Sequence, residues 1–471
     1  MKSKTFLYGL AWLGTLLATS VAQAETSANE WDAYPQALAK INAPVFPDRE
    51  FVITDFGAKE GGEALCGEAI ERAIAACSKA GGGKVVVPAG RFLTGPIHLQ
   101  SNVNLVVSKG ATLLFSTNFD DYLPMVYTRW EGVECYNYSP FIYAFEQENI
   151  AITGEGTLDG QAGWDNWWAW KRKRDEDGNQ LKILQDGPRA EMFEKAERGV
   201  PVAERRLGAG HYMRPNFVQP YRCKNVLIEG VTILRSPMWV LNPVLCRNVT
   251  VRGVTVNSHG PNNDGCDPES SQDVLIEDCV FDTGDDCIAI KSGRNNDGRR
   301  VGVASKNIIV RNCVMKDGHG GVVIGSEISG GCRNVFVEDC QMSSPNLDRA
   351  LRIKTNSIRG GVVENVFVRN VQVGQVGDAV LKVNFHYEEG NAGEHLPIVR
   401  NIVVRNLISK KSPRALDIRG YEESPITNIR LIDCQFEGVE QASVLINVKG
   451  LILDNVNMNT GRKTDLWGNP L

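Results

Sequence analysis

Three aspartates near the middle of the chain have the residue type that acid and base catalysis needs. Asp264 follows Asn262 and Asn263, and the adjacent pair Asp285 and Asp286 begins 21 positions later. Both groups come at the end of a segment with β-strand alternation. Acids that a repeating scaffold brings together can serve as general acid and general base on one bond. The sequence therefore predicts bond cleavage on a rigid β surface.

The segments that end in these acids belong to a repeat. Each copy begins with Asn, Asp or Gly, continues with alternating apolar and polar residues, and ends in a second short apolar run. The spacing of about 22 to 36 residues is typical of solenoids, and the alternation has the period of strands. Leucine-rich repeats are excluded because their leucine template is missing. We predict an all-β chain folded as a right-handed parallel β-helix, with copies that begin at Asn102, Asn149, Asn225, Asn248, Asp273, Asn307, Asn334, Asn365, Asn401, Asn428 and Gly450.

One position of the repeat is apolar in every copy from Asn225 onward. The sixth residue after each start is Val, Leu or Cys, which predicts a ladder of side chains inside the β-helix. Four of the twelve cysteines occupy this position, and we predict that they pack as small hydrophobic residues: Cys279, Cys313, Cys340 and Cys434. For the other eight, disulfide, metal-binding and core roles all stay open.

The chain ahead of the repeats predicts a cap. Apolar residues recur at helical spacing between Gly67 and Ala80, which indicates a short amphipathic helix. Such a helix covers the open end of a solenoid core. We therefore interpret residues 50–100 as an N-terminal cap region of one catalytic domain that comprises residues 25–471.

A long insertion, residues 160–221, interrupts the repeat. It contains Trp164, Trp167, Trp168 and Trp170, followed by a charged segment. Loops of this length on solenoids are often functional. Two roles stay open for the tryptophans, which can stack on sugar rings or anchor the loop.

The first residues predict export. Residues 1–24 have the basic start, apolar run and small-residue end of a secretory signal peptide. We expect a periplasmic or secreted protein with no membrane span in the mature chain. The formal net charge is −5, which argues against a nucleic-acid partner. An anionic substrate would need local basic residues against this overall charge.

Alignment of successive copies predicts where the acids lie. With Asp264, Asp285 and His319 at one position of three consecutive coils, the spacing of parallel strands makes them span roughly 10 Å down one face. Like charges this close raise the pKa of at least one acid, as glycosidic cleavage requires. The next coil offers Arg352 and Lys354 on one side of a strand, which suits an anionic sugar. Each pair alone is a common surface feature, and their shared phase is what indicates a site.

These residues resemble the motifs of the polygalacturonase family, the family 28 glycoside hydrolases. The family carries Asn-Thr-Asp, Gly-Asp-Asp, Gly-His-Gly and Arg-Ile-Lys in this order. Here the motifs read as residues 262–264, 284–286, 318–320 and 352–354, with a further match at Tyr387. One departure is Asn263 where the family often has Thr, and it leaves Asp264 in place. The resemblance covers nearly all of the mature chain and is closest to bacterial exo-acting polygalacturonases.

The resemblance implies inverting, exo-acting hydrolysis of α-1,4-galacturonosidic bonds in polygalacturonate or pectin, with no metal and no cofactor. The partner would be a pectic polysaccharide or an oligogalacturonide. Asp285 would be the general acid, Asp264 and Asp286 would act as base on the attacking water, and His319 would tune or orient the acid. Substrate binding is implied for Arg352, Lys354, Tyr387 and Asn262.

Several alternatives stay open. Endo-polygalacturonase, rhamnogalacturonan hydrolase and action on unsaturated oligomers fit the same motifs. A pectate lyase would use Ca²⁺ held by carboxylates, so it would lose activity in a chelator and form an unsaturated product. A non-catalytic carbohydrate-binding β-helix would keep its function when Asp285 is replaced by Asn. The long insertion predicts a wall at one end of a substrate groove, which favours attack at chain ends.

Overall fold

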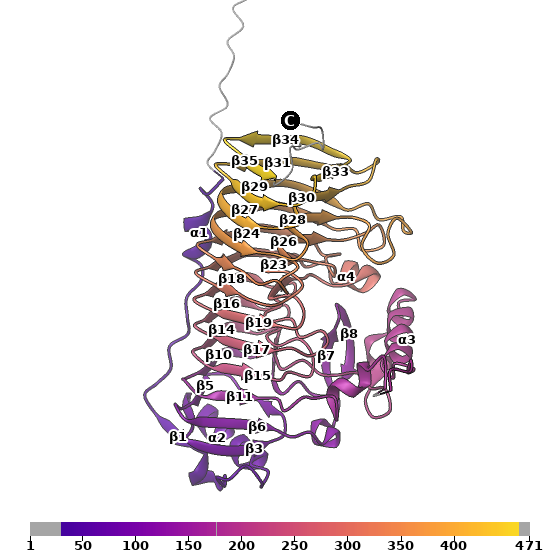
Figure 1. Ribbon diagram of the computed structural model, residues 1–471. Helices are drawn as coiled ribbons and strands as arrows, with labels where there is room; N and C mark the ends of the chain where they lie inside the picture. The colour runs from indigo at the N-terminus through magenta and orange to yellow at the C-terminus, as the bar shows by residue number, and fades with distance from the viewer. Residues whose placement is uncertain (1–29, 176, 461–471) are drawn as a thin grey trace, which may run out of the picture.

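The computed structural model describes residues 30–175 and 177–460, and the predicted signal peptide lies outside these residues. The chain winds into a single stack of coils that runs from the N-terminal end to the C-terminal end (Figure 1). Successive coils pair in parallel along the whole stack. The predicted right-handed parallel β-helix is confirmed.

Three faces of parallel strands make up each coil. The first face consists of β1 (Glu50–Val52), β2 (Gly83–Val87), β5 (Val103–Val107), β10 (Glu148–Thr153), β14 (Lys224–Glu229), β16 (Arg247–Arg252), β18 (Gln272–Glu277), β21 (Ser305–Arg311), β24 (Cys332–Glu338), β27 (Val362–Gln375), β29 (Ile398–Lys411), β31 (Ile426–Ile432) and β34 (Val448–Asp454). The second consists of β3 (Gly90–Thr94), β6 (Ala111–Phe115), β11 (Thr157–Asp159), β15 (Thr232–Leu234), β17 (Thr255–Ser258), β19 (Val280–Thr283), β22 (Val314–Met315), β25 (Gln341–Met342), β32 (Gln435–Val439) and β35 (Asn457–Thr460), with β27 and β29 continuing into it.

The third face is shorter and less regular. Its strands are β4 (Ile97–His98), β9 (Ile142–Phe145), β13 (Val218–Tyr221), β20 (Ile288–Ile290), β23 (Val322–Ile324), β26 (Arg349–Lys354), β28 (Ala379–Asn384), β30 (Arg414–Arg419) and β33 (Val444–Ile446). Between β13 and β20 two coils are joined to their neighbours by isolated bridges, at Leu241 and Val244 in one and at Cys266 and Glu269 in the other. These coils therefore keep the parallel register without forming full strands.

The residue that starts each copy explains why the repeat favours Asn. At this position the backbone is left-handed, with φ of 57° at Asn225, 56° at Asn307 and 59° at Asn334, a region that Asn tolerates better than most residues. From Asn149 to Asn401 the side-chain amide of each starting Asn also donates to the Asn or Asp at the start of the preceding copy, as from Asn334 to Asn307 at 3.1 Å. The same bond recurs from Asn365 to Asn334 at 3.0 Å. The predicted repeat register is confirmed by the strand pairing.

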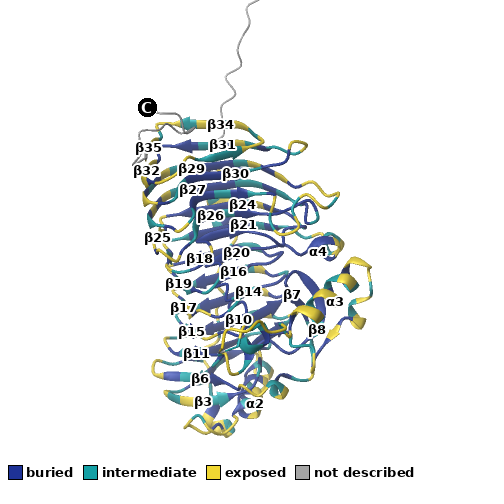
Figure 2. Cartoon of the chain, turned by 45° about the vertical axis from the view of Figure 1, so that its right-hand side comes forward, coloured by how far each residue is buried: buried dark blue, intermediate teal, exposed yellow. Residues whose placement is uncertain are grey.

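The interior of the coils is apolar. The predicted ladder residues are 0–1% exposed from Val231 to Cys434, whereas the last, Val456, is partly buried. Figure 2 shows buried strands through the middle of the stack and an intermediate to exposed β34 at its end. All twelve cysteines are free and buried. The predicted packing role of the four ladder cysteines is confirmed, and none of the other eight is in a disulfide.

Helix α2 (Gly67–Lys79) closes the N-terminal end of the stack (Figure 1). It buries the apolar stripe that the spacing predicts, Ala69, Ile70, Ala73, Ile74 and Cys77. The 3₁₀ helix η1 (Ile53–Phe56) lies beside it. On the outside of the first face, α1 (Tyr34–Leu38) and Trp31 pack against Phe336 and Phe367. The predicted capping helix is therefore confirmed.

Insertions gather on one side of the stack. The segment 160–221 contains η3 (Trp167–Lys171), α3 (Asp186–Glu197), η4 (Val202–Glu204) and β12 (Arg206–Leu207), and its last four residues form the coil strand β13. An antiparallel hairpin of β7 (Val126–Trp130) and β8 (Val133–Asn137), the short helix η2 (Phe119–Tyr122) and α4 (Asn295–Val301) were not apparent from the repeat. Figure 1 shows β7, β8, α3 and α4 on the same side. The extent of a single domain over residues 25–471 stays a prediction. Among the described residues, no helix has both the length and the apolar character needed to cross a membrane.

Replacing Asn334 tests the role of the asparagine ladder. Asn334→Ala removes two hydrogen bonds and places in a left-handed backbone a residue that tolerates it less well than Asn, so we expect the free energy of unfolding to fall by about 2 to 3 kcal/mol. Asn334→Gly removes the same bonds but tolerates the backbone, so its loss should be smaller. Urea denaturation followed by circular dichroism measures both. An Ala variant as stable as the Gly variant would show that the backbone conformation does not select Asn.

Candidate active site

The third face positions the acids, but not in the predicted alignment. Cys266 pairs with Ile288 across the coils, which places Asp264 beside Asp286. The prediction that Asp264 lies level with Asp285 is therefore wrong. Counted from the last paired residues of β17 and β19, Cys266 follows after eight positions and Ile288 after five. The turn that carries Asp264 is three residues longer than the next one, so the two turns cannot be aligned by counting along the coil. Alignment of Cys266 with Cys287 is wrong by one residue, because the partner of Cys266 is Ile288.

The predicted alignment of Asp285 with His319 is confirmed. Ile288 pairs with Val322, which sets these two residues side by side, and His319 Nδ1 lies 2.9 Å from Asp285 Oδ1. Gly320 follows at the position next to Asp286. A β-carbon there would lie 2.4 Å from the Val323 side chain and 3.3 Å from Asp286 Oδ1, so only glycine fits between these side chains.

Asp264, Asp285 and Asp286 form a cluster that we call the carboxylate trio. One carboxylate oxygen of each lies within 4.8 Å of the others. Asp286 is 0% exposed and Asp264 is 3% exposed, whereas the side chain of Asp285 is 18% exposed. Asp285 is therefore the member of the trio that is most accessible from solvent.

Three cations contact the trio. Lys354 Nζ lies 2.7 Å from Asp286 Oδ2, and Arg352 Nη1 lies 3.6 Å from Asp286 Oδ1. Lys291 Nζ lies 3.2 Å from Asp264 Oδ2. The predicted pair Arg352 and Lys354 is thus brought to the acids, and both cations also lie over the ring of Tyr387, at 5.4 and 5.2 Å from its centre.

Lys291 was missed by the sequence analysis, although a signal was present. Ile290, Ile324 and Ile353 pair across three coils, so the residues that follow them, Lys291, Gly325 and Lys354, share one position. Extending the phase of the Arg-Ile-Lys motif back by two coils would have found Lys291. Its ammonium also lies 4.3 Å from the ring centre of Trp239.

Burial and the neighbouring charges separate the acids. Burial raises the pKa of Asp264 to about 8, against the opposing effect of Lys291. Burial also acts to raise the pKa of Asp285, but the hydrogen bond and charge of His319, together with Lys354 and Lys291, outweigh it and lower the pKa to about 2. The hydrogen bond to Asp285 raises the pKa of His319 to about 9. At neutral pH one proton therefore lies on Asp264 and one on the pair of His319 and Asp285.

Two adjacent pockets open over these residues. The first pocket has a volume of about 310 Å³ and is lined by Glu131, Arg189, Trp239, Asn262, Asp264, Asp285, Lys291, His319, Ser326, Glu327, Asp348, Arg349, Arg352, Lys354, Tyr387 and Glu388. The second pocket has a volume of about 400 Å³ and is lined by Trp164, Lys171, Lys173, Pro261, Asn262, Gly284, Asp285 and His319. Asn262, Asp285 and His319 line both, so they lie at the boundary between the two.

The predicted site residues are thereby brought together. Seven of the eight line the first pocket, and the eighth, Asp286, is buried behind Arg352 and Lys354. Asn262 is held in place because its side-chain oxygen accepts a hydrogen bond of 2.7 Å from Arg214.

Ion pairs between insertions wall the far side of the first pocket. Glu131, at the turn of the β7–β8 hairpin, lies 2.6 Å from Arg189 of α3. Glu388 lies 2.8 Å from Arg359, and Arg294 bridges from Glu388 to another wall residue, Glu327, at 3.5 and 3.2 Å. The sequence predicts a wall but none of these residues, because the segments that carry them do not follow the repeat.

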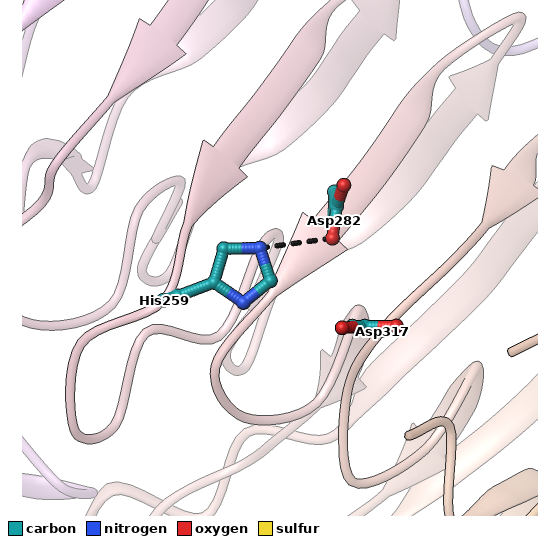
Figure 3. A group of neighbouring side chains, drawn as sticks. All are labelled: His259, Asp282 and Asp317. Carbon is teal, nitrogen blue, oxygen red and sulfur yellow. Dashed lines mark ion pairs between the residues drawn. The ribbon is translucent and has the colours of Figure 1, made fainter. Parts of the chain in front are cut away.

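Two groups among the described residues have the donor atoms of a metal site. The first is the carboxylate trio, whose charge is already countered by three cations and His319. The second is His259, Asp282 and Asp317 (Figure 3). Here His259 Nε2 lies 2.9 Å from Asp282 Oδ1, and Asp317 accepts hydrogen bonds from Ser344 and Asn346. His259 and Asp282 are therefore paired with each other, and Asp317 has its own hydrogen-bond donors. We describe the second group as part of a structural hydrogen-bond network.

Known proteins share this fold and sequence. A solved structure of a hyperthermoactive exopolygalacturonase from Thermotoga maritima is 46% identical, with a TM-score of 0.83, covering 89% of this chain and 95% of that chain. An exo-poly-alpha-D-galacturonosidase from Dickeya chrysanthemi is 29% identical in an alignment of 433 residues that covers 83% of this chain and 68% of that protein. An endo-polygalacturonase from Pectobacterium carotovorum subsp. carotovorum is 28% identical in an alignment of 358 residues that covers 72% of this chain and 77% of that protein.

The family pattern described as Glycosyl hydrolases family 28 matches residues 206–461, which are more than half of the chain and contain the whole carboxylate trio. The chain belongs to glycosyl hydrolase family 28.

Proposed function

We propose that this chain hydrolyses α-1,4-galacturonosidic bonds of polygalacturonate and removes sugars from the non-reducing end. The observation that carries the proposal is the carboxylate trio beside cations in a pocket that is walled on one side. An acid and a base cleave the bond, and Lys354, Arg352 and Lys291 suit a sugar with a carboxylate. The names of the relatives support the same substrate, and the partner is a pectic polysaccharide or oligogalacturonide.

The two pockets indicate how the substrate lies. Asp285 lines both pockets, so as general acid it can protonate the bridging oxygen between two sugars. Asp264 lines only the first pocket, so water activated on that side attacks the sugar bound there. The attacked sugar therefore occupies the first pocket and the leaving sugar the second. Because the far side of the first pocket is walled, the attacked sugar is at or near the non-reducing end of the chain.

The proton for the leaving oxygen comes from the pair of His319 and Asp285. In the free enzyme it lies on His319, since the nearby cations keep the pKa of Asp285 low. A substrate carboxylate bound at Arg352 and Lys354 offsets these positive charges. The pKa of Asp285 then rises, and the proton moves to Asp285, from which it can be donated.

The trio also bears on stereochemistry. A rule derived from pairs of carboxylates associates separations of about 5 to 5.5 Å with retention and about 6.5 to 9.5 Å with inversion. The spacing of 4.8 Å or less fits retention better, whereas the family resemblance implies inversion. We propose inversion, as the family resemblance implies, with Asp264 orienting the attacking water from the lining of the first pocket. Asp286 accepts the proton of this water once Lys354 and Arg352, which cover it in the free chain, turn to the carboxylate of the substrate.

Digestion of polygalacturonate tests the function and the mode of attack. We expect mono- or digalacturonate to appear from the start with little loss of viscosity. No unsaturated product should form, and addition of a chelator should leave the activity unchanged. Proton NMR of the first product should show the β-anomer. A ladder of oligomers would indicate endo attack, an ultraviolet-absorbing product that requires Ca²⁺ would indicate a lyase, and an initial α-anomer would indicate retention.

Asp285→Asn should lower kcat at least about 100-fold, because general acid catalysis typically contributes this much. The fold should be unchanged, since Asp285 lies at the pocket and outside the interior ladder. Asp282→Asn is the matched control, because Asp282 lies in the preceding strand β19 and lines neither pocket. A rate above about one tenth of wild type in Asp285→Asn would contradict the assignment of Asp285 as general acid.

The pH dependence of kcat/KM identifies the proton donor. We expect activity to fall as the pH rises through about 9, where His319 loses its proton. In His319→Gln the proton must lie on Asp285 itself, and a carboxylic acid beside Lys354 and Lys291 releases it at lower pH, so the alkaline limb should shift down. A limb near pH 8 that does not move in His319→Gln would identify Asp264 as the donor, because its pKa is about 8.

A further inference from the structure

The second pocket is formed in large part by the insertion. Trp164, Lys171 and Lys173 come from it, whereas the remaining lining residues belong to the turns of the coils. None of these three residues belongs to the motifs of the repeat. One part of the second pocket is therefore lined by catalytic residues from the coils, and another part is lined by residues of the insertion.

Three of the four tryptophans anchor the insertion, and the fourth faces the pocket. Trp167 is 0% and Trp170 is 5% exposed, and both belong to the main core cluster. Trp168 donates from Nε1 to the carbonyl of Ser236 at 2.8 Å. Trp164 is 46% exposed and lines the second pocket. Trp167, Trp168 and Trp170 thus anchor the insertion, and Trp164 is the tryptophan that is accessible to a sugar ring.

The seat of Trp168 fixes the insertion against the turn that carries Asn262 and Asp264. A β-carbon at Gly260 would lie 2.2 Å from the Trp168 ring, so the ring occupies the space that a side chain would take. This contact ties η3, which ends at Lys171, to the catalytic turn. The exposed Trp164 and the two lysines are therefore held at a fixed position relative to the trio.

The insertion contributes only cations among its charged lining residues. Lys171 is 20% exposed at its side chain and pairs with Asp186, itself 51% exposed, at 2.9 Å. Lys173 is exposed and forms no ion pair with another described residue. Such cations attract a carboxylate, and an exposed indole ring offers an apolar face to a sugar.

We propose that Trp164, Lys171 and Lys173 bind the sugar on the leaving side of the bond and select one whose carboxylate is free. The inference rests on the proposed function, because it takes the second pocket as the place of the leaving galacturonate. Trp164 supplies contact with the ring of this sugar, and the lysines supply its charge recognition. A methyl ester removes the negative charge, so a leaving sugar that is esterified loses the contribution of the lysines.

Two oligogalacturonates one sugar longer than the released product test the proposal, one with all carboxylates free and one with a methyl ester only on the reducing-end sugar. Wild-type enzyme should cleave the free form with a kcat/KM about tenfold higher or more, as two screened charge pairs provide. Lys171→Ala/Lys173→Ala should reduce this ratio to about twofold or less, mainly through KM. Trp164→Ala should lower kcat/KM for both substrates by a similar factor and keep the ratio.

The controls separate this proposal from the proposed function. Lys182→Ala removes an exposed lysine of the same insertion that lines neither pocket, and its ratio should equal that of wild type. Lys173→Ala alone, which leaves the pair of Lys171 and Asp186 intact, should lower the ratio even if the double variant folds poorly. Equal cleavage of the free and the esterified substrate by wild type, or an unchanged ratio in Lys173→Ala and the double variant, overturns the inference while the function stands. Failure of wild type on the free oligomer and on polygalacturonate overturns the function itself.

Discussion

Parallel pairing between coils fixes how closely charged side chains meet on the third face. Neighbouring strands lie about 4.8 Å apart, so paired residues are held together regardless of their charge. This pairing sets Asp264 beside Asp286 and Asp285 beside His319. Free side chains on a loop would move apart to reduce repulsion. The β-helix does not permit this, and burial raises the pKa of Asp264 in response.

The same pairing supplies the compensating charges. Lys291 and Lys354 share one position two coils apart, with Gly325 between them. The glycine leaves no side chain between the two ammonium groups, and each of them reaches an acid of the trio. The site is therefore a cluster of acids and cations from neighbouring coils, in which removal of one partner leaves a buried charge uncompensated.

How far the sequence predicts this structure depends on whether a residue belongs to the repeat. The coil register, the interior ladder and the helix from Gly67 follow from periodicity, because each copy repeats the same packing problem. The pairing partner of Asp264 does not follow from periodicity, because its turn differs in length from the next one and the motif gives no register for it. Glu131 and Arg189 lie in insertions whose positions depend on tertiary contacts alone. Lys291 is an intermediate case. Its position in the repeat matches that of Lys354, but it does not belong to any of the recognised motifs.

The buried cysteines have a consequence for the redox behaviour of the protein. Because all twelve are free and enclosed, no disulfide contributes to the stability of the folded state described here. Burial raises the pKa of several of these thiols, among them Cys266 and Cys287, so they react slowly with oxidants while the coils are intact. Separation of the coils would expose these thiols to solvent and make them more reactive.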